Sequence, residues 1–322
     1  GAIEAIVAAR DQSGDFTSLF DFCARVDRSR INRRVVEALV KAGAFDRLCA
    51  ARSSLLASVG LALEWADTQA AHADQGGLFD FGLEDEAAAH GASTAEPALV
   101  TMPEWDIKER LTFEKAALGF YLSGHLFEQS AGEVRRFAKL KIADLIDSRE
   151  PMLLAGIVAD LRVVNGQRGR VAIFKLDDMS DVVEAVANEE LLLANRDLLK
   201  DDELVIVQGK AQPDRFSGGI RFNVQSVWDL AAARCRFGKY LRVEVNGSVP
   251  PVAEVLRDFP SRRIVTEHGE LPQGLLVRLA LLRGAATGEL DLGDAARFYP
   301  SEAAIARWNT AATHGRATVV YE

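Results

Sequence analysis

The apolar side chains in the first part of the chain, residues 1–66, recur every three or four positions, which predicts helices rather than strands. Asn32 is a candidate N-cap for one of these helices, and Gly43 is a candidate stop for it. We expect the next helix to open at Phe45 and to run to about Trp65. This part of the chain therefore predicts two helices joined by a hairpin that contains a glycine.

The pattern changes in residues 151–232, where apolar and polar residues alternate as they do in strands. The expected strands are 153–164, 170–176, 182–187, 204–210 and 220–227. A helical stretch at residues 190–199 lies between the third and the fourth of them. Five short strands with one helix after the third is the strand order of an oligonucleotide-binding barrel, so we predict a five-stranded OB-fold here.

Residues 233–322 mix both periods and predict a small α/β domain. We expect strands near 241–245, 264–265, 275–282 and 317–321 and helices near 252–256 and 300–309. Between the helical part and the barrel we assign a linker, residues 67–104, and a helical connector, residues 105–150. The predicted fold class is therefore a multidomain α+β protein with a helical domain, an OB-fold barrel and a small C-terminal α/β domain.

Composition indicates the kind of protein to which these parts belong. The 322 residues are 48% apolar without a long uninterrupted apolar run, so we expect a soluble chain with no membrane span. Cys23, Cys49 and Cys235 are far apart and form no C-x-x-C, which argues for a cytoplasmic location and against zinc or a disulfide framework. Because the chain begins at Gly1, directly inside an apolar helix, we interpret it as a fragment of a longer protein.

Charge is distributed unevenly along the chain. The net charge is −9, but eleven carboxylates fall between Glu64 and Glu109 against a single cation, Lys108. The acidity therefore belongs to the linker, and the folded parts are near neutral with room for local basic faces. The global charge does not exclude a nucleic-acid partner.

Inside this acidic segment, Gln75 is followed at fixed spacing by two large apolar residues, Leu78 and Phe79. A segment this acidic and alanine-rich buries too little apolar surface to order itself, so the apolar pair stays exposed unless a partner covers it. We interpret these three residues as a docking peptide. The alternative is a short amphipathic extension that packs on its own domain.

Two parts of the chain are candidates for contact with nucleic acid. The hairpin at Gly43 can offer backbone amides to a phosphate of duplex DNA, and Arg33 and Arg34 lie beside it. The alternative is a plain turn next to solvated arginines. Asp46 favours this alternative, because its negative charge would repel a phosphate at the hairpin. In the barrel, the residues that would form a groove for single-stranded DNA are Arg168, Arg170, Lys175, Arg215, Phe216 and Arg221. These barrel cations could equally be solubilising residues.

The sequence contains no nucleophile motif, no phosphate loop and no histidine pair at metal-binding spacing. Asp177 and Asp178 could in principle hold Mg²⁺, but two carboxylates that open a turn are more often turn formers. Phe174 and Phe222 are expected in the barrel core. We assign no catalytic residue, no metal ligand and no cofactor to this chain.

Several stretches resemble the C-terminal, non-catalytic region of the α subunit of bacterial DNA polymerase III, the replicative polymerase of the C family. They are residues 16–22, 32–46, 114–125, 166–178 and 216–219. The resemblance implies a tandem helix-hairpin-helix domain at 1–66 and a sliding-clamp (β) binding peptide at Gln75, Leu78 and Phe79. It also implies an OB-fold at 151–232 and a domain at 233–322 that binds the τ subunit of the clamp loader. DNA synthesis would then be the work of upstream domains that are absent here.

Two rival interpretations stay open. An error-prone paralogue of the same polymerase family is expected to lack a comparable τ-binding domain, whereas this chain has a long segment after Tyr240. A single-strand-binding or tRNA-recognition protein could share the barrel, but it would have no use for the glutamine and apolar pair. One departure from the family pattern is that the predicted hairpin has one glycine, Gly43, instead of two.

Overall fold

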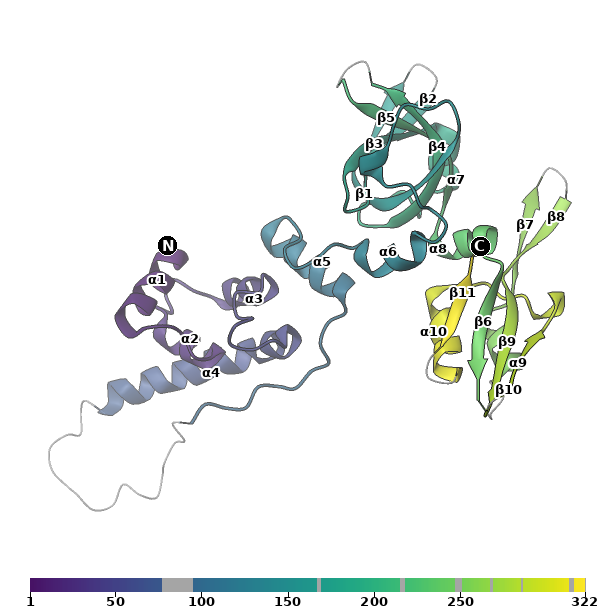
Figure 1. The fold of residues 1–322 in the computed structure, drawn as a ribbon. Helices are drawn as coiled ribbons and strands as arrows, with labels where there is room; N and C mark the ends of the chain where they lie inside the picture. The colour runs from purple at the N-terminus through teal and green to yellow at the C-terminus, as the bar shows by residue number, and fades with distance from the viewer. Residues whose placement is uncertain are drawn as a thin grey trace. The chain divides into compact units, whose positions relative to one another are not determined.

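The computed structural model describes the chain in two compact units, Gly1–His125 and Leu126–Glu322 (Figure 1). The structure describes all residues except 77–94, 167–168, 215–217, 247–250, 267–268, 285, 313–315 and 322, and it describes the backbone alone at 73–76, 265–266 and 269. The predicted fold class is confirmed, because the chain combines a helical part, a closed five-stranded barrel and a further sheet. Among the described helices, none has both the length and the apolar character that crossing a membrane requires.

The first unit is built from helices, drawn from purple to blue in Figure 1. They are α1 (Ala2–Ser13), α2 (Leu19–Arg25), α3 (Arg33–Lys41), α4 (Arg52–Gly76) and α5 (Ile107–Leu118). Helices α2 and α3 both pack against the long helix α4. Their shared core contains Phe20, Phe22, Val36, Leu55 and Val59. The helical period of the apolar residues therefore translates directly into one buried face for each helix.

Helix α3 begins and ends where the sequence predicts. The Asn32 side chain accepts a hydrogen bond from the Val35 amide at 3.0 Å, which is an N-cap. At the other end Gly43 adopts φ +80°, a conformation that favours glycine. The next helix begins at Arg52, however, and not at Phe45, so that prediction was wrong. The chain turns there instead, with the Asp46 amide donating to the Gly43 carbonyl at 3.2 Å and the Leu48 amide to the Phe45 carbonyl at 2.8 Å, while the Phe45 ring is buried in the helical core.

Helix α4 also extends eleven residues beyond the predicted end at Trp65, to Gly76. Val100 and Met102, which follow the undescribed segment 77–94 in the chain, lie along the same helix. The amide of Val100 donates to Ser58 Oγ at 2.8 Å, and the amide of Met102 donates to Ser54 Oγ at 3.0 Å. Two serines one helical turn apart thus hold the returning backbone on α4. Both flanks of residues 77–94 therefore belong to the helical unit.

The barrel of the second unit closes in the order β1-β2-β3-β5-β4. Its strands are β1 (Met152–Gly166), β2 (Gly169–Asp177), β3 (Val182–Ala187), β4 (Leu204–Pro213) and β5 (Ile220–Trp228), with α7 (Glu189–Ala194) between β3 and β4. The strands β3 and β5 pair in parallel and all other neighbours pair antiparallel. This is the strand order that the sequence predicts. The helix is shorter than expected, since it ends at Ala194 and turns follow.

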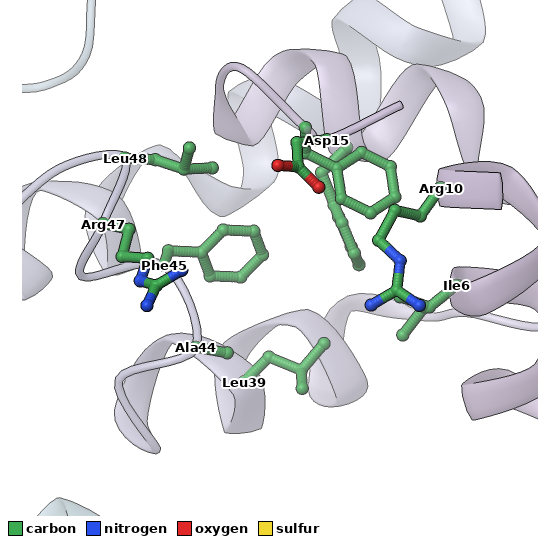
Figure 2. A pocket seen from close by; sticks show the side chains of 10 residues that line it. Ile6, Arg10, Asp15, Leu39, Ala44, Phe45, Arg47 and Leu48 are labelled. Atoms are coloured by element: carbon green, nitrogen blue, oxygen red, sulfur yellow. The ribbon is translucent and has the colours of Figure 1, made fainter. Parts of the chain in front are cut away.

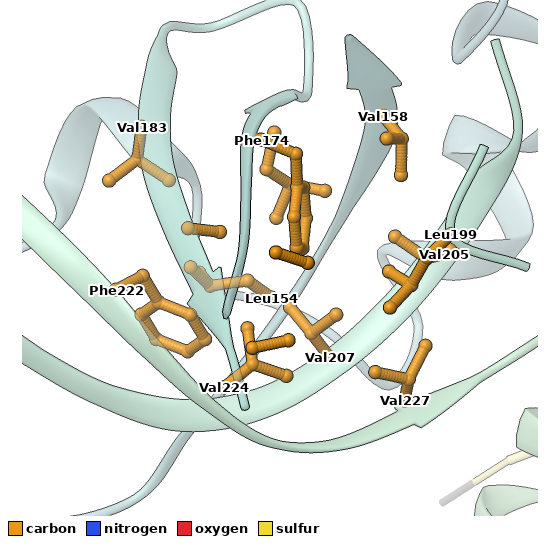
Figure 3. Close-up of a cluster of buried hydrophobic side chains, with 14 of the residues drawn as sticks. Leu154, Val158, Phe174, Val183, Leu199, Val205, Val207, Phe222, Val224 and Val227 are labelled. Carbon is orange, nitrogen blue, oxygen red and sulfur yellow. The ribbon is translucent and has the colours of Figure 1, made fainter. Parts of the chain in front are cut away.

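The interior of the barrel is filled by alternate side chains of its strands, as Figure 3 shows. Phe174 and Phe222 are 1% and 0% exposed, which confirms them as core residues. Leu154, Val207 and Val224 pack in the same cluster. Since these residues point inward, their neighbours along β2, β3 and β5 must point to the outer face.

The last part of the chain forms a four-stranded sheet with the order β10-β9-β6-β11. Its strands are β6 (Tyr240–Val245), β9 (Leu276–Arg283), β10 (Ala286–Asp291) and β11 (Ala317–Val320), with a separate hairpin of β7 (Arg262–Thr266) and β8 (Gly269–Gln273). The helices are α9 (Val252–Asp258) and α10 (Glu302–Ala311), and Trp308 of α10 is fully buried. The predicted strands and helices of this α/β part are present, and β8 and β10 are additional.

Two short helices flank the barrel in the chain, with α6 (Glu128–Val134) before β1 and α8 (Leu230–Phe237) after β5. Arg234 of α8 is 3% exposed and donates to both carboxylate oxygens of Glu133 at 2.8 and 2.7 Å. The Tyr321 hydroxyl donates to the same carboxylate at 2.6 Å. This contact ties α6 and α8 to the end of β11.

Candidate nucleic-acid interface

The outer face of strands β2, β3 and β5 brings three charged residues into one row. In the strand register, Lys175 of β2 lies opposite Glu184 of β3, and Glu184 lies opposite Arg221 of β5. Partly buried apolar residues, Ile173 and Val186, form a neighbouring pair on the same face. The face therefore combines two cations, which can follow a phosphate backbone, with partly exposed aliphatic side chains.

Each predicted barrel cation that the structure describes already has a carboxylate partner. Lys175 Nζ lies 2.7 Å from Asp160 Oδ2, and Arg221 Nη2 lies 2.6 Å from Glu184 Oε1. Arg170 Nε donates to Glu189 Oε1 at 2.9 Å. The hydrogen bonds from Arg170 hold the pKa of Glu189 below its usual value. A phosphate that bound here would have to replace these carboxylates as the partner of the cations.

The pairs of Lys175 and Arg170 are accessible to solvent, whereas Arg221 is half-buried and Glu184 Oε1, the atom that it contacts, is buried. The side chains of Lys175, Arg170 and Arg221 are 54%, 50% and 30% exposed. Exposed pairs are held weakly, so an exchange of partners costs little free energy. The remaining predicted groove residues, Arg168, Arg215 and Phe216, lie outside the described residues.

In the helical unit, the residues predicted to contact DNA are Arg33, Arg34 and Gly43. Arg33 and Arg34 are both exposed at the first turn of α3, where Arg33 pairs with Glu37 at 2.7 Å. The amide of Gly43 donates to the Val40 carbonyl at 3.0 Å, and a Cβ at this position would overlap the guanidinium of Arg52. Gly43 is therefore required by the turn itself. Of the residues predicted to contact DNA in this unit, Arg33 and Arg34 are the exposed ones.

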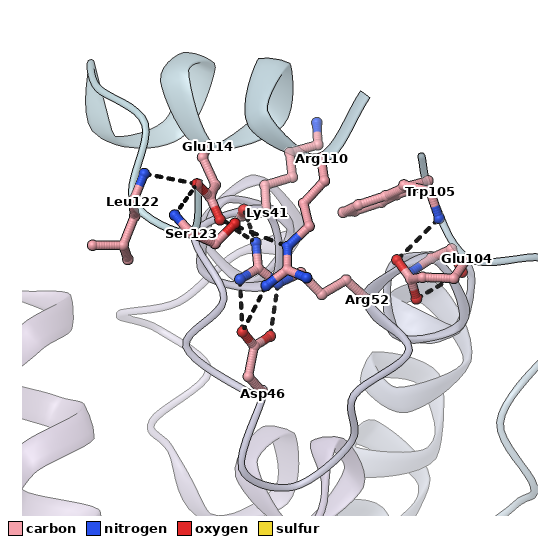
Figure 4. Close-up of polar contacts among 10 residues, drawn as sticks. Lys41, Asp46, Arg52, Glu104, Trp105, Arg110, Glu114, Leu122 and Ser123 are labelled. Carbon is pink, nitrogen blue, oxygen red and sulfur yellow. Dashed lines mark hydrogen bonds and ion pairs between the residues drawn. The ribbon is translucent and has the colours of Figure 1, made fainter. Parts of the chain in front are cut away.

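A buried ionic network, which the sequence analysis did not predict, holds the hairpin to α5 (Figure 4). Arg52 donates to both oxygens of Asp46 at 2.7 and 2.6 Å and to Glu114 Oε1 at 2.8 Å. The other oxygen of Glu114 accepts from the amides of Leu122 and Ser123 at 2.8 and 2.9 Å. Glu114 is 0% exposed. One carboxylate therefore joins α4 to the backbone that follows α5.

A signal for this network was present in the sequence. Arg52 precedes Leu55 and Val59 by three and seven positions, so it occupies the helix face that those buried residues define. Glu114 follows the buried Leu111 by three positions in the same way. A charged residue at a position where the helical period expects an apolar one indicates a buried ion pair. When two such residues have opposite charges, as Arg52 and Glu114 do, they are candidate partners of each other.

Asp177 and Asp178 act as turn residues within the described structure. Asp177 Oδ1 accepts from the Met179 amide at 2.9 Å. The buried Asp178 carboxylate accepts from Arg135 and from the amides of Ile142 and Ser180. Burial alone would raise the pKa of Asp178, but these hydrogen bonds lower it. Across the described residues, no group of three or more potential metal ligands is found.

The docking peptide falls at the edge of what the structure describes. The backbone of Gln75 belongs to the last turn of α4. Leu78 and Phe79 lie outside the described residues.

Comparison with known protein families supports the two predicted nucleic-acid modules. A family model described as a helix-hairpin-helix motif matches residues 1–55, and one described as an OB-fold nucleic acid binding domain matches residues 152–230. The chain is also similar to a small single-stranded DNA-binding protein from Streptomyces coelicolor. That likeness has 19% identity and a TM-score of 0.23, and covers 26% of this chain and 97% of that one. By its fold the chain combines a helix-hairpin-helix region with an OB-fold of the nucleic-acid-binding class.

Sequence relatives identify the family more narrowly. The DNA polymerase III subunit alpha of Neisseria meningitidis is 41% identical over 74% of this chain and 20% of its own length. That of Vibrio cholerae is 33% identical over 94% of this chain and 26% of its own, and that of Escherichia coli is 36% identical over 76% and 21%. The chain is homologous to part of DNA polymerase III subunit alpha, which confirms the predicted resemblance. It spans about a fifth to a quarter of the length of these relatives.

Proposed function

We propose that this chain is the non-catalytic C-terminal region of a replicative DNA polymerase α subunit and positions that enzyme on DNA in the cytoplasm. The observation that carries the proposal is the homology, 33–41% identical, together with the match of both nucleic-acid modules. In this proposal, single-stranded DNA lies across the outer face of β2, β3 and β5, and duplex DNA meets the arginines at the start of α3. The catalytic chemistry belongs to other domains.

The geometry of the barrel face supports the first part. Lys175 and Arg221 lie on either side of Glu184, so a phosphate backbone that crossed the strands would meet two cations in succession. Each cation that neutralises a phosphate adds about −0.7 to the slope of log affinity against log salt concentration for a single strand. The interaction is therefore expected to be weak and sensitive to salt.

The experiment is a titration of the full chain with labelled oligothymidylate at several salt concentrations. Lys175→Ala and Arg221→Ala should each weaken binding about fivefold, equivalent to about 1 kcal/mol, and should make the salt slope shallower by about 0.7. Lys200→Ala is the matched control, because Lys200 is 58% exposed and paired with Asp197 but lies outside this face. Equal losses in all three variants would contradict this binding face.

We also propose that Gln75, Leu78 and Phe79 bind the sliding clamp. The support is the match of these residues to the family's clamp-binding motif, in a segment whose flanks both belong to the helical unit. A peptide that leaves and rejoins one unit loses less conformational freedom on binding than a free tail. A weak contact of this kind keeps the enzyme near the primer end through high effective concentration.

Clamp binding is tested by titrating purified clamp into the full chain. Leu78→Ala with Phe79→Ala should weaken binding by about a hundredfold or more, because burial of two such side chains is worth roughly 3–6 kcal/mol before ordering costs. Phe81→Ala with Leu83→Ala makes the same chemical change two and five residues further on and should alter affinity by less than about twofold. Unchanged affinity in the first variant would reject the motif.

The partner proposed for residues 233–322 is the τ subunit of the clamp loader. Support comes from the resemblance and from a folded α/β part in this region. Purified τ should co-elute with the full chain in size-exclusion chromatography. Separate elution at micromolar concentrations would argue for the error-prone paralogue instead.

A further inference from the structure

A cavity of about 380 Å³ lies in the helical unit, among α1, α2, α3 and the turn that follows α3 (Figure 2). None of its lining residues is among the DNA or clamp contacts proposed above. Its large apolar lining residues are Ile6, Phe16, Phe22, Leu39, Phe45 and Leu48, and we call the cavity the phenylalanine pocket. The volume is within the range of sites that hold a small ligand or a few side chains.

The aromatic wall of the phenylalanine pocket is fixed by contacts behind it. The ring centroids of Phe16 and Phe22 are 5.0 Å apart, and those of Phe22 and Phe45 are also 5.0 Å apart, both edge to face. The guanidinium of Arg25 lies 4.6 Å from the centroid of the Phe16 ring. Arg25 in turn donates to the carbonyl of Gly14 at 2.6 Å. A ligand would therefore meet a preformed surface and would not have to order it.

Two cations stand at the rim. Figure 2 shows Arg10 and Arg47 on opposite sides of the Phe45 ring. Arg10 is 53% exposed, and its nearest carboxylate, Asp11, is 3.5 Å away. Arg47 is exposed and makes no ion pair with any other described residue. Asp15 is the only anion among the described lining residues, so the rim has a positive balance that favours an acidic ligand.

We propose that the phenylalanine pocket binds an acidic segment of a partner protein through one large apolar side chain. The side chain fills the pocket, and carboxylates on either side of it pair with Arg10 and Arg47. A nucleotide base fits less well, because its polar edge would meet hydrocarbon on the pocket floor and lose its hydrogen bonds to water. Leucine and phenylalanine side chains have no such edge.

The probe is a fluorescein-labelled peptide, DEDFLEDE, titrated into the full 322-residue chain and followed by fluorescence anisotropy. Ala44→Phe should weaken binding about tenfold or more, because Ala44 lines the pocket from an exposed position and a larger side chain there fills it. Arg10→Glu with Arg47→Glu should weaken it similarly and tests the rim separately. Arg30→Glu with Arg257→Glu makes the same charge change at two exposed arginines outside the lining and should alter affinity by less than about twofold.

Two further probes separate the alternatives. The peptides DEDAAEDE and KRKFLKRK remove the anchor and reverse the charge, and both should bind at least about tenfold more weakly than DEDFLEDE. A labelled oligothymidylate should bind the Ala44→Phe variant as well as it binds the original chain. The proposal is overturned if DEDFLEDE shows no saturable binding, if Ala44→Phe leaves its affinity unchanged, or if Ala44→Phe weakens the oligonucleotide and not the peptide.

Discussion

The helical unit and the barrel both contain ion pairs of similar length in very different surroundings. In the helical unit Arg52 lies 2.8 Å from Glu114, and these side chains are 3% and 0% exposed. On the barrel Lys175 lies 2.7 Å from Asp160, and these are 54% and 64% exposed. The distance between the charges therefore does not distinguish the two pairs, and burial does.

The difference in burial assigns the pairs different work. A buried charge that loses its partner is left without water, so the network around Arg52 can only be architectural. An exposed charge that loses its partner is solvated again at little cost. The proposed exchange of a carboxylate for a phosphate at the barrel cations would therefore cost little free energy, whereas the pair of Arg52 and Glu114 has no such exchange open to it.

The first prediction concerns Arg52→Ala, which removes the central residue of the buried ion pair. The substitution leaves Glu114 and Asp46 without their main partner, and we expect a loss of about 3–5 kcal/mol in the free energy of unfolding of the helical unit. Because a chain of two units need not unfold in one step, the measurement is hydrogen exchange of peptides from residues 1–125 at increasing urea concentration.

The control is Arg33→Ala, which removes an arginine from the same unit. Arg33 pairs with Glu37 at 2.7 Å, but its side chain is 68% exposed. An exposed pair of this spacing is worth about 0.3–0.5 kcal/mol. Similar losses in both variants would show that burial is not what separates the two kinds of pair.

The second prediction concerns pH. Burial alone would raise the pKa of Glu114, but hydrogen bonds from Ser123, Arg52 and Leu122 outweigh it and lower the pKa from 4.5 to about 2. A carboxylate with a lowered pKa in the folded state binds fewer protons there than in the unfolded state, so its contribution is present above pH 4.5 and is lost as the pH falls towards 2. The shift corresponds to about 3 kcal/mol at neutral pH.

The measurement compares the original chain with Glu114→Gln, whose side chain has the same shape and no charge to titrate. The variant should be less stable at pH 7, and the difference should shrink steadily between about pH 4.5 and pH 2. Hydrogen exchange of residues 1–125 reports the stability of the helical unit alone. Parallel pH profiles for the two proteins would mean that Glu114 does not keep its charge in the folded state.

Sequence patterns predicted the elements whose buried residues have a regular period. The barrel strands followed from their strand-like apolar patterns, their order from the helix after the third strand, and α3 from Asn32 and Gly43. Strand β10 was missed because all six of its residues are exposed and it has no apolar face to detect. Strand β8 contains Pro272, which breaks the usual strand signal. The start of α4 was misplaced because the buried Phe45 looks like a helix position although it anchors a turn.

The candidate site was predictable in its residue types and not in its pairings. Lys175 and Arg221 were predicted as groove residues and do lie on the outer face, next to the inward Phe174 and Phe222, but no sequence rule shows that Glu184 lies between them. That juxtaposition depends on the register of three strands, one of which pairs in parallel with a strand distant in sequence. Partners that come from separate strands are set by the tertiary fold.

The last prediction has the smallest expected effect on stability and concerns Glu184 on the barrel. Glu184 lies 2.6 Å from Arg221 and 3.8 Å from Arg162, so Glu184→Gln removes one carboxylate partner from both cations, and among the described residues Arg221 keeps only Asp214, at 3.4 Å. We expect the affinity of the full chain for oligothymidylate to rise about two- to fivefold, because phosphates no longer compete with a carboxylate. The free energy of unfolding should change by less than about 1 kcal/mol, since the pair is partly exposed.

Glu190→Gln provides the control, because Glu190 is an exposed residue of α7 that the same substitution neutralises away from this row. If both variants gain affinity equally, the gain comes from total charge and the face of β2, β3 and β5 has no special role. If only Glu184→Gln gains, the carboxylate between Lys175 and Arg221 occupies the position that a phosphate takes. In that case the Glu184 carboxylate occupies, in the absence of DNA, the position that a backbone phosphate takes when DNA binds. A fully buried ion pair cannot be replaced in this way.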